Sequence, residues 1–153
     1  MKRIGVAGLI RSGGIHSMHL LMGRRGKDPN RGLFVLPGGG LQEGESLEDA
    51  FCREIMEETG LEIERRPQRW EHLINVFELP DRLILLAHAS VKCRWMEETP
   101  VYSAGYFDDK PRDGDDPYDV QWFGLRELPW DISPVCVPML QSWGFSPGKK
   151  PND

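Results

Sequence analysis

The part of the chain best equipped for chemistry places three carboxylates within five residues, shortly after a run of glycines. The run is Gly38-Gly39-Gly40, and the carboxylates belong to Glu54, Glu57 and Glu58. On a helix, residues three or four positions apart lie on one face, so these side chains would project together. Clustered carboxylate oxygens are ligands that hard divalent cations such as Mg²⁺ prefer. The spacing therefore favours a metal site that acts on phosphoryl groups, whose oxygens need neutralising and positioning.

The residues that surround the carboxylates predict a helix over Leu47–Thr59. Ser46 is a favourable N-cap residue, and Asp49 follows three positions later, as in a capping box. Gly60 is the residue type that ends a helix in a left-handed conformation. A helix with these ends would carry all three glutamates in its last two turns.

The apolar residues of this helix predict where the glutamates point. Leu47, Ala50 and Phe51 share the face of Glu54, so we expect the carboxylates to point toward the protein body. The last turns of a helix disfavour anions, and only Arg53 is near enough in sequence to offset the charge. A bound metal ion is the simplest missing cation.

The spacing of these residues resembles the Nudix box. Gly39 is followed after five residues by Glu45 and after seven more by Arg53-Glu54-Ile55-Met56-Glu57-Glu58-Thr59-Gly60-Leu61, with every specified position filled. At average residue usage, seven fixed types match by chance at roughly one start position in a hundred million. The preceding Leu-Pro-Gly-Gly and the strand pattern extend the resemblance over about residues 4–142.

This resemblance implies roles for individual residues. Glu57 and Glu58 match the main metal ligands, and Gly38 matches a glycine that binds metal through its backbone carbonyl. Glu54 matches either a further ligand or the base that deprotonates water. Acids of the downstream loop are alternatives for that base, namely Glu97, Glu98, Asp115 and Asp116. The expected catalytic residues are therefore Glu54, Glu57 and Arg53, with Gly39, Glu45 and Gly60 as structural support.

Two residues outside the box are candidates for contact with the substrate. Arg25 lies where related MutT-like sequences carry a basic residue at the end of the second strand, although a solvated strand-end arginine is the plain alternative. Trp122 could border a base pocket, and packing in the core is its alternative.

Composition sets the broad class. The 153 residues suit one domain, expected over residues 1–145, and 39% apolar with 28% charged residues fits a soluble protein. A net charge of −5 argues against binding a nucleic acid polymer. The three cysteines are far apart, which is typical of reduced thiols in the cytoplasm. We find no signal peptide and no apolar run long enough to span a membrane. The composition is compatible with either a monomer or a homodimer.

The hydrophobic pattern predicts strands at 3–10, 18–25, 33–36, 70–78, 82–93 and 119–123, and a closing helix over 133–143 with Ser133 as its N-cap. Pro138 would kink that helix or confine it to its later residues. Residues 146–153 are expected to form a disordered tail. Strands, a crossover helix and more strands predict an α/β fold of the α+β type with a mixed sheet. The resemblance implies a Nudix-like α/β/α sandwich.

The resemblance implies an enzyme that uses Mg²⁺, with Mn²⁺ as a substitute, to hydrolyse a diphosphate bond in a nucleoside diphosphate derivative. Within this class we favour a MutT-like nucleoside triphosphate pyrophosphohydrolase that releases a nucleoside monophosphate and pyrophosphate. The alternatives are a hydrolase of ADP-ribose or of a nucleotide sugar, and a catalytically silent nucleotide-binding sensor. The long segment 94–117 is either a surface excursion or a lid over the substrate.

Overall fold

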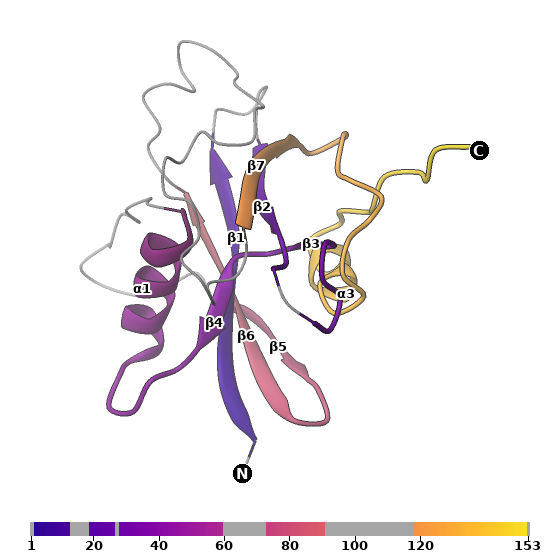
Figure 1. The fold of residues 1–153 in the computed structure, drawn as a ribbon. Coiled ribbons are helices and arrows are strands. Elements are labelled where there is room, and N and C mark those ends of the chain that lie inside the picture. The colour runs from indigo at the N-terminus through magenta and orange to yellow at the C-terminus, as the bar shows by residue number, and fades with distance from the viewer. Residues whose placement is uncertain (1, 13–18, 27, 60–72, 91–117, 153) are drawn as a thin grey trace.

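The computed structural model describes residues 2–12, 19–26, 28–59, 73–90 and 118–152. Within these residues, strands form one mixed sheet and two helices lie against it, α1 at Leu47–Thr59 and α3 at Val137–Gln141 (Figure 1). The strands are β1 (Arg3–Ser12), β2 (His19–Arg24), β3 (Phe34–Val35), β4 (Gly38–Gly40), β5 (Leu73–Glu78), β6 (Arg82–Ser90) and β7 (Tyr118–Gly124). No helix in the described ranges is long and apolar enough to cross a membrane.

Strand β1 is the centre of the sheet. It pairs in parallel with β6 over nine residue pairs, from Arg3 opposite Arg82 to Arg11 opposite Ser90. Its other edge pairs antiparallel with β4 near its start and with β2 at its end. Strand β5 extends the sheet beyond β6, while β3 and β7 both pair with β2. Parallel and antiparallel pairs coexist, so the expected mixed sheet is confirmed.

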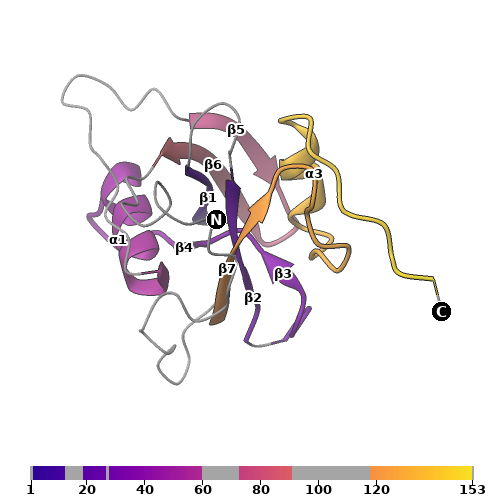
Figure 2. The same cartoon turned by 90° about the horizontal axis from the view of Figure 1, so that it is seen from above.

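The helices cover opposite faces of the sheet, as the two views in Figures 1 and 2 agree. Alternating residues of β1 explain the two faces, because successive side chains of a strand point to opposite sides. Val6 and Ile10 pack in the cluster under α1, whereas Ala7 and Leu9 pack in the cluster on the α3 side. The absence of a side chain at Gly8 leaves space for Phe51 of α1, because a Cβ there would lie 2.7 Å from the Phe51 ring.

The predicted helix over Leu47–Thr59 is confirmed at both ends. The Ser46 hydroxyl accepts a hydrogen bond from the Asp49 N–H at 3.1 Å, as an N-cap residue should. Ala50, Phe51 and Ile55 are fully buried on the side of this helix that faces the sheet. Leu47 differs from expectation, because it lies in the first turn beyond the edge of the core and is 36% exposed.

The predicted strands agree with the sheet apart from shifts at their ends, and the first two form the expected antiparallel pair. Strand β4 was not expected, because glycines favour turns. The predicted ends at residues 18, 70–72 and 91–93 lie outside the described ranges. So does the segment 94–117 with Glu97, Glu98, Asp115 and Asp116.

The closing helix is shorter than predicted. Pro138 has no N–H to donate, which confines it to a first turn, and regular α3 begins at Val137. Ser133 is therefore not the N-cap; its carbonyl accepts from the Cys136 N–H at 2.9 Å in the turn before the helix. Gly144 then ends the chain's last turn with a positive φ of 80°.

Residues 146–152 contain no helix or strand, yet they contact the body of the protein. The Gly148 N–H donates to the Pro129 carbonyl at 3.0 Å, and Lys150 lies 5.4 Å from the centroid of the Trp130 ring. A Cβ at Gly148 would collide with the Leu128 carbonyl, so only glycine allows this approach. These contacts join Gly148 and Lys150 to the segment that precedes α3.

Candidate active site

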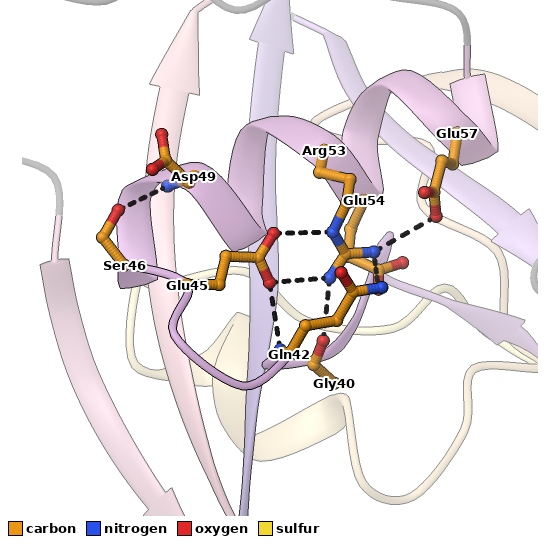
Figure 3. A network of polar contacts seen from close by, with 8 residues as sticks. All are labelled: Gly40, Gln42, Glu45, Ser46, Asp49, Arg53, Glu54 and Glu57. Atoms are coloured by element: carbon orange, nitrogen blue, oxygen red, sulfur yellow. Dashed lines mark hydrogen bonds and ion pairs between the residues drawn. The ribbon is translucent and has the colours of Figure 1, made fainter.

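Arg53 connects the residues of the candidate site (Figure 3). Its Nε and Nη2 donate to the two carboxylate oxygens of Glu45 at 2.7 and 3.0 Å. Its Nη1 donates to Glu54 at 2.9 Å and to Glu57 at 3.3 Å. Nη2 also donates to the Gly40 carbonyl at 3.0 Å. One planar side chain therefore fixes the turn before α1 to two carboxylates of the helix, a use that suits the fork geometry of arginine.

The charges of this network shift one another's protonation. The hydrogen bond from Arg53 lowers the pKa of Glu45, and the Gln42 N–H, 3.0 Å from Glu45, lowers it further. The hydrogen bond to Glu45 raises the pKa of Arg53 well above its usual range. Burial raises the pKa of Glu54, and the hydrogen bond from Arg53 opposes that rise only in part. Burial thus favours the protonated form of the Glu54 carboxylate.

The glycine run brings backbone close to the helix. The Gly38 N–H donates to Glu58 Oε2 at 3.0 Å, which connects β4 to the last turn of α1. A Cβ at Gly39 would overlap the carboxylate of Glu54, so Gly39 must be glycine for the two to approach. A Cβ at Gly40 would meet nothing within 4 Å. The supporting role expected of Gly39 therefore has a steric reason.

The three helix carboxylates differ in their surroundings. The Glu54 side chain is 14% exposed and Glu58 is half-buried, as expected for side chains that face the body. Glu57 differs from that expectation, because its side chain is 55% exposed at the edge of the helix. Glu57 is therefore the most exposed of the three carboxylates.

The donor set suits a hard divalent cation, since it consists of carboxylate oxygens beside a turn of glycines. The oxygens are directed instead to Arg53 and to the Gly38 N–H, and no three acidic, histidine or cysteine side chains among the described residues are gathered around one point. Glu57 and Glu58, with Glu54 and the Gly38 carbonyl, are the groups that would hold a metal ion.

A cavity of about 380 Å³ adjoins the carboxylates. Gly38, Gly39, Gly40 and Glu58 line one side of it, and the α3 region with Ser133 and Met139 lines another. Its size falls within the range of small-molecule sites, about 300–1,000 Å³. The cavity and the carboxylate network therefore share the glycine strand and Glu58.

The two predicted substrate contacts fall in different places. Arg25 lines the cavity, directly after the end of β2, and its Nε donates to the Pro29 carbonyl at 2.7 Å. Trp122 lies in the core under α1 with Phe51 and Ile55 and is 2% exposed. It is not among the cavity residues, so the structure gives it the packing role.

Sequence reasoning missed the other cationic residues of the cavity, Arg3 and Arg82, and the contact between Asn30 and Ser133 at its wall. Only the strand pattern could have indicated the arginines, because they occupy matched positions at the starts of β1 and β6. Gly60, expected to end α1, lies outside the described residues.

The fold and the carboxylate helix agree with a known family. The family model described as NUDIX domain matches residues 1–141. The chain belongs to this family, whose members generally use divalent metal cations.

Similar proteins carry the names of hydrolases and pyrophosphatases. The ADP-ribose pyrophosphatase of Methanocaldococcus jannaschii is 32% identical over 72% of this chain, and the match spans 57% of that protein's own length. The RNA pyrophosphohydrolase of Rhizobium meliloti is 30% identical, covering 86% of this chain and 83% of that one. The crystal structure of a MutT NUDIX hydrolase from Burkholderia pseudomallei has a TM-score of 0.61 at 24% identity, over 93% of this chain and 98% of that chain. The last similarity concerns the fold alone.

Proposed function

We propose that this protein hydrolyses a diphosphate bond in a nucleoside diphosphate derivative, with Mg²⁺ as its cofactor. The main support is that the carboxylates held by Arg53 lie next to a ligand-sized cavity, which is lined by Gly38–Gly40 and Glu58. The names of the relatives, which specify ADP-ribose and RNA pyrophosphate chemistry, support the same reaction class.

The reaction adds the oxygen of water to one phosphorus and breaks the bond from that phosphorus to the bridging oxygen. Divalent cations would supply neutralisation of the phosphoryl oxygens and activation of the water. In this proposal Glu54 takes the proton of that water or serves as a further metal ligand. The burial that raises the pKa of its carboxylate supports the first of these roles. Arg53 acts by holding Glu54 and Glu57 in place from its own anchor on Glu45.

Within this class we favour a nucleoside triphosphate as substrate, cleaved to a nucleoside monophosphate and pyrophosphate. The support is the MutT-like strand-loop-strand over β2 and β3, which places Arg25 at the cavity. ADP-ribose is the second candidate, because one relative at 32% identity is named for its hydrolysis. The 5′-phosphates of an RNA are a third candidate substrate. The acidic net charge argues against RNA, but one relative is named as an RNA pyrophosphohydrolase.

A panel of nucleoside triphosphates, ADP-ribose and nucleotide sugars, incubated with Mg²⁺ and analysed by mass spectrometry, tests the proposal. In ¹⁸O-labelled water the label should enter a phosphate-containing product. Label found only on a sugar carbon would show glycosidic chemistry and refute the reaction. Tight nucleotide binding without any turnover across the panel would instead favour the silent sensor.

A further inference from the structure

The cavity has an unequal distribution of charge. Arg3, Arg25 and Arg82 line it, whereas Glu58 is the sole carboxylate among its described lining residues. Glu58 lies at the glycine strand, where its carboxylate accepts the Gly38 N–H. The cavity therefore extends from the carboxylate helix toward a cationic region.

The cationic region is produced by the register of the central strands. Arg3 and Arg82 are opposite each other in the parallel pair of β1 and β6. Arg3 lies an even number of residues from Ala7 and Leu9 on β1, and Arg82 lies an even number of residues from Ile84 and Leu86 on β6. All four apolar residues belong to the core on the α3 side. Because side chains two apart share a face of a sheet, both arginines belong to the cavity side. Two like charges are thus side by side, and an anion between them would relieve the repulsion.

Arg82 has one buried hydrogen-bond donor that no described residue satisfies. Its Nε is shielded from solvent and has no hydrogen-bond partner among the described residues. Buried donors without partners are rare in proteins and call for an explanation such as a ligand. The charges of Arg82 and Arg25 also both reach the Cys136 thiol, where burial raises the pKa to about 11 and the two arginines act in the opposite direction. Arg25, Arg82 and Cys136 all line the same cavity.

The rest of the described lining offers no stacking surface for a nucleobase. The described lining residues include no aromatic side chain on which a base could stack. Apolar groups from Leu36, Ile84 and Met139 form buried walls with few amide or hydroxyl groups, apart from Asn30 and Ser133. Among the described lining residues, charge is therefore the main property that can select a ligand.

We propose that the cavity holds the outer phosphates of a nucleoside 5′-polyphosphate, with Arg82 and its neighbour Arg3 as specificity-determining cations. This inference rests on the proposed function, because it takes the cleaved bond to lie at the carboxylate helix beside Glu58. The substrate then carries two phosphates beyond the cleaved bond, and they leave together through the cavity as pyrophosphate. ADP-ribose carries a neutral sugar in that position and leaves the buried Arg82 donor without a partner.

The test compares ligands that share one nucleoside, so that any preference for the base cancels. Binding of α,β-methylene-ATP, AMP and ADP-ribose is measured by calorimetry with Mg²⁺ for the wild type and for Arg82→Gln. We expect Arg82→Gln to weaken α,β-methylene-ATP by about tenfold or more, as for a lost hydrogen bond to a charged group. AMP and ADP-ribose should change by less than about twofold.

Matched variants control for charge and folding. Arg126→Gln makes the same charge change at an exposed position outside the cavity and should leave all three affinities unchanged. Arg82→Lys keeps the charge and should recover most of the α,β-methylene-ATP affinity. If Arg82→Gln does not fold, Arg3→Gln at an exposed position carries the comparison, with an expected loss of about threefold for α,β-methylene-ATP alone. Inorganic triphosphate is a second probe, which should weaken in parallel with α,β-methylene-ATP.

The outcomes separate this inference from the proposed function. Equal weakening of all three nucleotides, or no change in a folded Arg82→Gln protein, would overturn the cavity assignment even if the enzyme hydrolyses diphosphates. Wild-type protein that selects α,β-methylene-ATP through Arg82 but cleaves no substrate would retain the cavity assignment and refute the proposed function.

Discussion

The two faces of the sheet carry different charged residues and are built in different ways. On the α1 face, a single helix and the turn before it supply the carboxylates, and Arg53 connects them. Around a cavity on the other side, β1 and β6 supply Arg3 and Arg82, and the residue after β2 supplies Arg25. The first arrangement is a local motif and the second is a product of sheet register. In the two proposals above, the helix provides the chemistry and the cavity provides the selectivity for the substrate.

The largest effect that would sharpen this comparison is expected at Glu57. Glu57→Gln removes a charge that a divalent cation would need, so turnover of the preferred nucleotide should fall by about 10²- to 10³-fold. The fold should survive, because this side chain is 55% exposed. Turnover and circular dichroism of the variant are the measurements. Wild-type turnover of Glu57→Gln would break the assignment of chemistry to the α1 face.

Arg53 should produce the next largest effect, on both activity and stability. Arg53→Met leaves the carboxylates of Glu45 and Glu54 without their shared donor. We expect turnover to fall by about 10- to 100-fold, as for other residues that orient ligands. Stability should fall by about 2 kcal/mol from the lost charge-assisted hydrogen bonds.

Arg53→Lys is the control for charge alone. It keeps one positive charge but lacks the fork that reaches Glu45, Glu54 and Gly40 together, so it should recover only part of both losses. Denaturant unfolding and steady-state kinetics measure the two effects. A fully active Arg53→Met variant would show that the carboxylates do not depend on this side chain.

A pair of glycine variants tests the fit between β4 and α1. Gly39→Ala places a methyl group where the Glu54 carboxylate lies, so we expect Glu54 to move and kcat to fall by about tenfold. Gly40→Ala adds the same group without meeting Glu54, so its loss of kcat should be smaller than that of Gly39→Ala although Gly40 also lines the cavity. Equal kinetics for the two variants would contradict the described approach of Gly39 to Glu54.

The smallest signal is expected from the thiol on the α3 face. Burial raises the pKa of Cys136 to about 11, so at pH 8 almost none of it is the reactive thiolate. Native protein treated with iodoacetamide should therefore be labelled much more slowly at Cys136 than at the partly exposed Cys52, as followed by peptide mass spectrometry. Labelling at Cys136 should increase as the pH rises toward 11. Rapid labelling at pH 8 would show that the cavity wall is open to solvent and more polar than described.

The α1 face could be predicted because its determinants are close together in sequence. The cap at Ser46, the buried Phe51 and the Arg53 pairing with Glu45 follow from helix periodicity and from the resemblance to a known motif. The exposure of Glu57 could not be predicted, because it depends on where the sheet edge ends beneath the helix. Trp122 was ambiguous for a similar reason, since a tryptophan on a strand suits a core or a pocket equally well until its neighbours are known.

The α3 face resisted prediction because register determines it. Arg3 and Arg82 meet only if β1 pairs with β6 in parallel, and a shift by one residue would place one of them on the other face. Strand β4 was missed because paired glycines have no side-chain pattern to reveal them. The length of α3 depended on Pro138, whose confining effect was one of the two expected outcomes.

The nine-residue parallel pairing of β1 and β6 also affects how the chain folds during its synthesis. During synthesis on the ribosome β1 emerges first, but the strand that completes its longest edge appears only after α1 has been made. Contacts between distant segments slow folding, and an apolar strand awaiting its partner can pair with other chains. We therefore expect the refolding yield to decline as protein concentration rises, and the nascent chain to benefit from chaperones until β6 has joined the sheet.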